Sequence, residues 1–302
     1  MQFGLSQEQI LLQDNVNRFL DDNSALDRVR TYADGGEDAD IWAGLAELGI
    51  PALLIPEAQG GIGLQPLDAA IVAECLGSHI APTPFLESAV MAPTALVASG
   101  GDHDELLAEI AAGTTRIGIA FGEAIKRRNN AGVTVKDGRM SGTSRYAFDA
   151  EANAYLVADQ YQHIYLVRAD DPGLKRSHLA TVDKTRRTVE LNYDNVTADL
   201  VSDDATVFTA TVDIGRMALA ADTLGAAQNM LDQAVEYAKQ REQFNRPIGS
   251  FQAVKHMCAE MAAQLEPCRS MVWFAGHALA ELPEESRITA CHTKAHLAEV
   301  GQ

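Results

Sequence analysis

Basic residues, cysteines and long apolar runs are all scarce in this sequence. Lys and Arg total 24 against 42 Asp and Glu, which leaves a formal net charge of −18 and argues against nucleic acid as the main partner. No apolar run approaches the roughly 18–20 residues that a membrane span needs, so we expect no membrane association. The four cysteines form no Cys-x-x-Cys pair, and the first residues lack the basic and apolar regions of a signal peptide. We therefore expect reduced, buried thiols and a cytoplasmic location.

The spacing of apolar residues changes twice along the chain and predicts three domains in an α+β protein. Residues 1–113 predict a helical domain, and Ser6 with Gln9 is typical of a capping box at its first helix. Residues 114–205 hold short runs rich in Val, Ile, Tyr and Thr, which predict a β-domain built as a barrel or an orthogonal sandwich. Residues 206–302 predict a helical bundle.

The β-domain is predicted from short runs that Gly, Pro and Asn interrupt. Asp137-Gly138 is a strong signal for a hairpin turn inside it. The predicted strands are 116–121, 132–136, 139–148, 154–158, 163–168, 178–182 and 188–193.

A helical hairpin is predicted near the C-terminal end. Apolar residues recur every three or four positions over 217–234 and again over 251–279, which indicates two long helices. Residues 245–249 break the first helix, and Ser250 is the expected N-cap of the second. Pro267 lies inside the second pattern and predicts a bend or a break there.

The corner of this hairpin reads Arg241-x-x-Phe244, followed by Pro247-Ile248-Gly249-x-Phe251-Gln252. The string resembles a helix–turn–helix signature of the acyl-CoA dehydrogenase family, whose helix–β–helix order the whole chain follows. The resemblance implies an FAD cofactor held across a subunit interface, with the Arg on the pyrophosphate, the aromatic ring at the adenine end and the Gln hydrogen-bonded nearby. Arg suits that role because its fork of donors matches phosphate oxygens. The implied cofactor-binding residues here are Arg241, Phe244, Ile248 and Gln252.

The flavin loop of that family, Thr-Glu-Pro-x-x-Gly-Ser-Asp, is not kept. At its place residues 121–130 read Phe-Gly-Glu-Ala-Ile-Lys-Arg-Arg-Asn-Asn, and only Glu123 matches. The family's next flavin contacts, an aromatic and a hydroxyl residue, correspond by position to Tyr146 and Phe148. Tyr146 can still stack on a ring and is the fifth implied cofactor residue, whereas Phe148 has no hydroxyl to offer. Both also fit the interior of a β-domain.

The carboxylate that removes the substrate α-proton in the family is also missing. One family position for this base is Gly215, and the other lies beyond the last residue of this sequence, Gln302. We therefore assign no catalytic residue. Gly215 in place of a Glu suggests room for a bulky acyl group such as a steroid fragment.

Three other motifs carry weaker signals. The Gly-rich turn at 60–63 has no Lys-Ser/Thr after it, which argues against a P-loop. His292 and His296 lie one helical turn apart without an obvious third ligand, so no metal site is predicted. The basic run 126–128 is expected to be an exposed loop, with CoA phosphates or an acidic partner surface as the alternative.

A kept corner beside a lost base and a lost flavin loop predicts one subunit of a heteromeric enzyme. The sequence resembles the base-lacking subunit of bacterial, steroid-side-chain type acyl-CoA dehydrogenases, in which two unlike chains pair into a tetramer. The implied reaction is α,β-dehydrogenation of an acyl-CoA thioester with FAD, in steroid or cholesterol side-chain degradation. The implied partner is a homologous subunit that carries the catalytic Glu. Two alternatives stay open: a homotetrameric FAD-dependent enzyme with an unidentified base, and a non-catalytic structural subunit without flavin.

Overall fold

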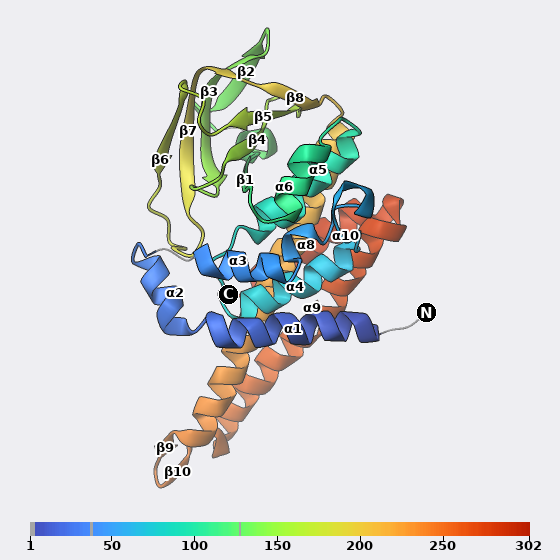
Figure 1. Cartoon of the computed structure of the whole chain (residues 1–302). Helices are drawn as coiled ribbons and strands as arrows, with labels where there is room; N and C mark the ends of the chain where they lie inside the picture. Colours follow the sequence, from blue (N-terminus) through green and yellow to red (C-terminus); the bar gives the residue numbers. More distant parts are fainter. Residues whose placement is uncertain (1–3, 37–38, 127) are drawn as a thin grey trace. The chain divides into compact units, whose positions relative to one another are not determined.

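The computed structural model describes residues 4–36, 39–126 and 128–302 (Figure 1). The chain divides into two compact units, each built from separate stretches of sequence. The first combines the residues up to Leu26 with Pro66–Ala81 and Arg216–Gln302. The second combines Asp27–Gln65 with Pro82–Gly215. The N-terminal helices are therefore divided between the two units.

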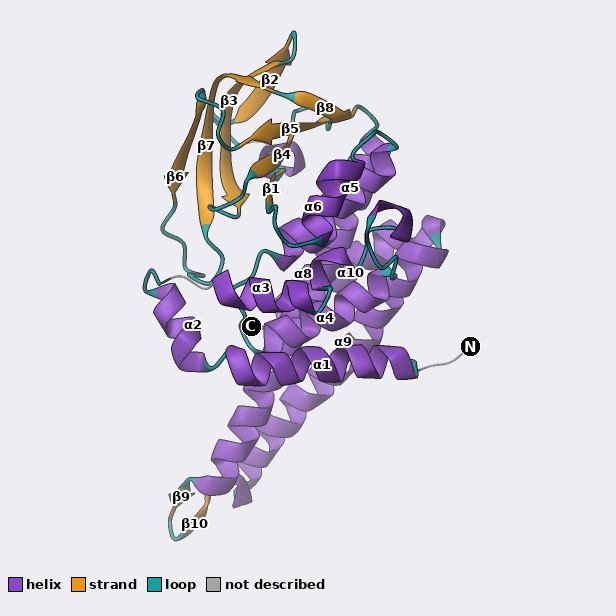
Figure 2. Cartoon of the chain, in the orientation of Figure 1, coloured by secondary structure: helices purple, strands orange, loops and turns teal. Residues whose placement is uncertain are grey.

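The first unit is a helical bundle (Figure 2). It contains α1 (Gln7–Asn23), α4 (Pro66–Ser78), the part of α8 (Ala205–Gln240) from Arg216 onward, α9 (Gln252–Glu281) and α10 (Pro283–Val300). Nearly every residue of α4 is buried, Asp68 and Glu74 included, and α4 packs against both α1 and α9. Within the described ranges, no helix is both long and apolar enough to span a bilayer.

The predicted start of α1 is confirmed. The Ser6 hydroxyl accepts a hydrogen bond from the Gln9 N–H at 3.1 Å, and the Gln9 side-chain oxygen accepts one from the Ser6 N–H at 3.0 Å. This reciprocal pair satisfies backbone donors that have no partner inside the helix.

The start of α9 differs from the prediction. Ser250 belongs to a 3₁₀ turn, η4 (Ile248–Ser250). The N-cap of α9 is therefore Phe251, which has the extended backbone of an N-cap residue but makes no side-chain capping bond. Of the bend or break predicted at Pro267, the break is wrong, because α9 continues through this residue. The buried residues Leu265 and Cys268 on either side hold that turn against the bundle.

Two glycines let α4 and α8 approach backbone to backbone. A Cβ added to Gly225 of α8 would lie 1.9 Å from the carbonyl oxygen of Glu74, and one added to Gly77 of α4 would lie 2.0 Å from that of Asp222. No side chain fits either space. Beside this contact Arg269 of α9 forms an ion pair with the buried Glu74 carboxylate. Burial raises the pKa of Glu74, and Arg269 opposes the rise.

The second unit contains an eight-stranded sheet and short helices. Among the described residues, the strand order is β6-β7-β3-β1-β4-β5-β8, with β2 paired to β3, and only β1 and β4 pair in parallel. The strands are β1 (Ile117–Ala120), β2 (Gly132–Lys136), β3 (Arg139–Phe148), β4 (Ala154–Ala158), β5 (Ile164–Arg168), β6 (Leu174–His178), β7 (Thr188–Thr197) and β8 (Asp199–Ser202). The helical elements are α2 (Leu26–Ala33), α3 (Ala39–Glu47), the 3₁₀ turns η1 (Ile50–Ala52) and η2 (Glu57–Gln59), the π-helix η3 (Phe85–Met91), α5 (Ala92–Ser99), α6 (Asp104–Ala111) and α7 (Gly122–Ile125).

Two edges of the sheet were not predicted correctly. The strand expected over 178–182 is wrong, since β6 ends at His178. β6 is an exposed edge strand of sequence Leu-Lys-Arg-Ser-His, so it lacks the apolar alternation that marks a half-buried strand. The other edge strand, β8, was not predicted.

We expect Gly225→Ala to destabilise the protein, although Ala is intrinsically the better helix former by about 1 kcal/mol. The added methyl group would overlap the Glu74 carbonyl, and such overpacking costs about 1–3 kcal/mol. The measurement is the free energy of unfolding in urea, with Met230→Ala at an exposed position of α8 as the control. A Gly225→Ala variant more stable than the wild type would mean that the two helices are not in backbone contact.

Candidate functional site

The hairpin corner is a tight two-stranded turn between α8 and α9. β9 (Glu242–Gln243) pairs with β10 (Arg246–Pro247), and the Ile248 N–H donates to the Arg241 carbonyl at 2.7 Å. Phe244 and Asn245 both have positive φ, at 53° and 60°, as a two-residue hairpin turn requires. A positive φ is costly for a residue as large as Phe. Figure 1 shows β9 and β10 at the free end of the α8–α9 hairpin.

The structure brings the four predicted corner residues together on this tip. Arg241, Phe244 and Gln252 are exposed, Phe244 by 87%, and Ile248 is half-buried. Phe244 meets the ring of Phe251 edge-on, with 6.1 Å between centroids. The tip thus presents an aromatic ring, a guanidinium and an amide to its surroundings, which is a donor set suited to phosphates and an adenine ring.

Tyr146 lies elsewhere, on a bulge of β3 in the second unit. The register of β3 and β7 shifts between Ser144 and Ala147, and Tyr146 has a φ of 56°. Its ring is 51% exposed, so the reading of Tyr146 as β-domain core is wrong. The guanidinium of Arg128 lies over the ring, 5.4 Å from the centroid, in a cation–π contact.

An FAD molecule fits the corner but not the face of Tyr146. At the corner, exposed donors are available to phosphate oxygens. At Tyr146, the guanidinium of Arg128 already lies over one face of the ring, and the neighbouring Phe148 offers no hydroxyl hydrogen bond. The Tyr146 ring therefore already has a cation as its stacking neighbour on one face.

The space at the missing base is filled. A Cβ added to Gly215 of α8 would lie 2.9 Å from Sδ of Met91, a buried residue of the π-helix η3. The suggestion that Gly215 leaves room for a bulky acyl group is therefore wrong for this structure. A carboxylate side chain at position 215 would need Met91 to move.

A buried carboxyl group that the sequence did not indicate lies on η3. Glu87 is 4% exposed, and its Oε2 has no hydrogen-bond partner among the described residues. It faces a cavity of about 20 Å³. Burial raises the pKa of Glu87 to about 7, and the nearby Asp149 adds to the rise while Arg186 and Arg116 oppose it. A cavity of this size holds about one water molecule and no acyl chain, so Glu87 is not positioned as a catalytic base.

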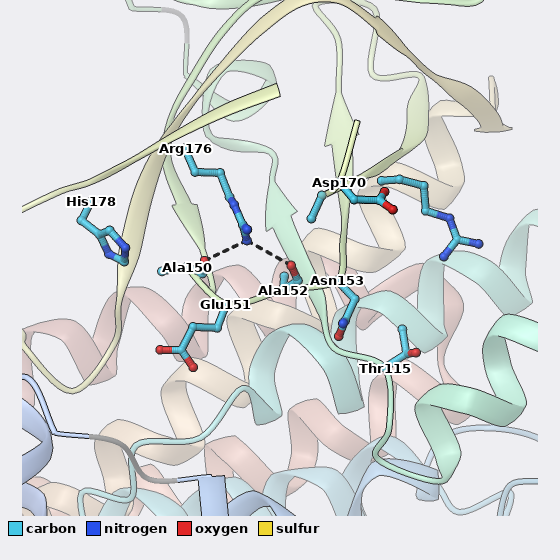
Figure 3. Close-up of a pocket in the computed structure, with 10 residues that line it drawn as sticks. Thr115, Ala150, Glu151, Ala152, Asn153, Asp170, Arg176 and His178 are labelled. Carbon is cyan, nitrogen blue, oxygen red and sulfur yellow. Dashed lines mark hydrogen bonds between the residues drawn. The ribbon is translucent and has the colours of Figure 1, made fainter. Parts of the chain in front are cut away.

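A larger pocket, of about 930 Å³, adjoins the β3–β4 turn (Figure 3). Arg176 points into it and donates to the carbonyls of Ala150 and Ala152, at 3.1 and 3.3 Å. The lining mixes both charges, which suits a polar ligand of low net charge. It comprises Thr115, Ala150, Glu151, Ala152, Asn153, Arg168, Ala169, Asp170, Arg176 and His178. No motif in the sequence indicates this pocket, because its residues come from turns and from two strands, β5 and β6.

The cysteines and the histidine pair are unremarkable in position. Cys75 and Cys268 are buried as expected, and burial raises the pKa of Cys75 to about 12, whereas Cys258 and Cys291 are only half-buried. The rings of His292 and His296 are 6.5 Å apart. Over the ranges that the structure covers, no three His, Cys, Asp or Glu side chains are grouped to hold a metal ion.

Comparisons with known proteins agree with this geometry. The family described as "Acyl-CoA dehydrogenase, N-terminal domain" matches residues 6–114, and "Acyl-CoA dehydrogenase, C-terminal domain" matches residues 205–302. Acyl-CoA dehydrogenase IpdE2 of Mycobacterium tuberculosis is 34% identical over 253 residues, which cover 83% of this chain and 69% of that protein. Acyl-CoA dehydrogenase FadE27 of the same organism is 33% identical over 233 residues, covering 74% and 62%.

Solved structures share the fold. The "Tcur3481-Tcur3483 steroid ACAD G363A variant" matches with a TM-score of 0.85 and 27% identity, over 98% of this chain and 86% of that chain. The ChsE4-ChsE5 complex from Mycobacterium tuberculosis matches with a TM-score of 0.87 and 26% identity, over 100% and 87%. N-terminal helices, a central sheet and a C-terminal helical domain make up the acyl-CoA dehydrogenase fold, as predicted. This chain belongs to the acyl-CoA dehydrogenase family.

We expect Glu87 to make the stability of the protein fall as pH rises towards 8. The folded-state pKa of about 7 lies above the usual 4.5, so the folded state holds the proton more tightly than the unfolded state. The stabilisation is complete below pH 4.5 and is lost as pH rises through 7. Relative to Glu87→Gln, the wild type should lose on the order of 3 kcal/mol between pH 4.5 and 8.

This expectation is checked by urea unfolding of both proteins across that pH range. The difference between the two free energies removes the contribution of all other titrating groups. A difference that stays constant with pH would show that Glu87 titrates normally and is not buried as described.

Proposed function

We propose that this chain is the base-lacking subunit of a heteromeric, cytoplasmic acyl-CoA dehydrogenase. Its partner would be a homologous subunit that carries the catalytic Glu, in a tetramer that oxidises an acyl-CoA thioester at its α and β carbons. The observation that carries the proposal is the hairpin corner. Its guanidinium, aromatic ring and amide are exposed together on one tip, while the base position at 215 is a glycine without a carboxylate.

Four corner residues of this chain are proposed to hold the FAD. Arg241 would bind the pyrophosphate through charge-assisted hydrogen bonds, and Gln252 would add an amide donor. Phe244 and Ile248 would pack beside the adenine ring. FAD, when bound, supplies the acceptor for the hydride that leaves the β-carbon. The part of this chain is to bind and orient the cofactor rather than to move a proton.

The filled space at Gly215 supports the need for a partner. A base must reach the α-proton of the substrate in a site that excludes water. Met91 occupies the space that a side chain at 215 would enter, and the cavity beside Glu87 admits only about one water. Neither position in this chain is suited to proton abstraction, so the carboxylate is assigned to the partner.

The proposed substrate class is a steroid-derived acyl-CoA, as in steroid or cholesterol side-chain degradation. Two solved structures with this fold support the proposed substrate class and the pairing of unlike chains. One is the Tcur3481-Tcur3483 steroid acyl-CoA dehydrogenase, and the other is the complex of ChsE4 with ChsE5. Both pair two differently named chains. The extension to this chain rests on 26–27% identity along nearly its whole length.

Two other functions predict different observations. A homotetrameric dehydrogenase with an unidentified base would be yellow and active when this chain is produced alone. A structural subunit without flavin would leave its complex with a homologue unchanged by any substitution at the corner.

We expect the isolated chain to be inactive and the chain joined with a base-bearing homologue to be active. General-base catalysis contributes about 10²–10⁴-fold, so a site without the carboxylate should turn over at least a hundredfold more slowly. The measurement is flavin bleaching and turnover with an acyl-CoA, for the chain alone, the homologue alone and the two together. Saturating, flavin-dependent turnover by the isolated chain would refute the heteromer.

We expect Arg241→Ala to weaken FAD retention by the complex. The lost charge-assisted contact is worth roughly 1.5–3 kcal/mol, which corresponds to about a 10- to 150-fold rise in Kd. Flavin absorbance after dialysis measures the effect, and Arg287→Ala on α10, an exposed basic residue away from the corner, is the control. Equal flavin occupancy in both variants would remove Arg241 from the cofactor site.

A further inference from the structure

The strained bulge at Tyr146 is held in place by a buried carboxylate. Glu123 of α7 is 6% exposed, and its Oε1 accepts a hydrogen bond from the backbone N–H of Arg145 at 3.2 Å. Arg145 directly precedes Tyr146, so this bond anchors the bulge whose left-handed residue turns the tyrosine ring outward. A bulky residue keeps such a backbone only where its surroundings enforce it.

The same carboxylate holds Arg128. Glu123 Oε1 lies 3.2 Å from Nη1 of Arg128, and the other carboxylate oxygen is buried without a partner among the described residues. A Cβ added to Gly122 would lie 3.2 Å from the same Nη1, so the backbone of α7 also confines the guanidinium. A buried carboxylate is stable only while its cation stays beside it.

Arg128 is therefore not a freely moving side chain of a basic loop. Tethered to Glu123, its guanidinium stays over the Tyr146 ring, 5.4 Å from the centroid. Arg145 does not compete for this place, because its own guanidinium faces Glu190, with Nε 3.4 Å from the carboxylate. A planar ligand that stacks on the face of Tyr146 beneath the guanidinium would have to displace Arg128 and leave Glu123 buried and unpaired.

We propose that Glu123, Arg128 and Tyr146 form a plug that closes the sheet unit of this chain to an isoalloxazine ring. The proposal rests on the proposed function, in which FAD is the cofactor of the complex, and deepens it by assigning this chain the corner alone. Arg128 is the residue that excludes the ring, and Glu123 is the residue that positions Arg128.

The test uses lumiflavin, an isoalloxazine that lacks the pyrophosphate and the adenine that the corner is proposed to hold. The full chain alone is studied by equilibrium dialysis and by quenching of lumiflavin fluorescence. We expect no binding by the wild type and at least tenfold tighter binding by the Glu123→Gln, Arg128→Ala double variant. Adding Tyr146→Leu to the double variant should abolish the gain.

The control is Arg139→Ala. Arg139 is an exposed residue of β3, the strand that carries Tyr146, but its guanidinium donates to Thr197 and does not lie over the tyrosine ring. If the double variant is unstable, Arg128→Gln gives the same comparison while keeping a donor for Glu123. Binding by the wild type that Tyr146→Leu weakens would overturn the proposal, and so would a well-folded double variant that does not bind. Both outcomes are read from lumiflavin binding by the chain alone. They can therefore be told apart from a failure of the proposed function, which is measured as turnover with a partner subunit.

Discussion

The ion pair between Arg116 and Asp149 fixes the turn on which the second unit depends. Two nitrogens of Arg116 donate to the two carboxylate oxygens of Asp149, at 2.9 and 2.6 Å, and the Asp149 side chain is 2% exposed. Tyr155 donates its hydroxyl proton to the Asp149 carbonyl at 2.9 Å. A carboxylate can be buried this far only when such partners replace its water. Because Asp149 directly follows β3, the pair also sets where the bulge at Tyr146 can lie.

Two cavities of opposite character adjoin this turn. The small one is lined by the buried Glu87 together with Arg116 and Asp149. The larger one is lined by the turn and by Arg176, whose guanidinium donates hydrogen bonds to the carbonyls of Ala150 and Ala152 in that turn. The same turn thus borders a cavity with room for about one water molecule and a pocket large enough for a ligand.

The binding groups of the chain are unevenly distributed between its units. The hairpin corner exposes a guanidinium and an aromatic ring on a strained turn, which is the state of a surface that awaits a partner or a ligand. In the sheet unit, by contrast, the guanidinium of Arg128 already has partners within the chain. Glu123 accepts a hydrogen bond from it, and it lies over the ring of Tyr146. This combination of one open surface and one closed surface fits the proposed function, in which the chain would complete a cofactor site on another subunit.

The sequence by itself determined the elements whose signals are local. Ser6 and Gln9 specify the start of α1, Asp137-Gly138 specifies a turn with two positive φ angles, and the corner string assigns the family. The tertiary structure alone decided that Met91 fills the space at Gly215, that β6 is a polar edge strand and that Glu87 is buried beside Asp149. It also decided that Arg128 covers Tyr146, 18 positions further along the chain. The reason is that these contacts depend on strand register and on how a helix meets a turn, which no short stretch of sequence encodes.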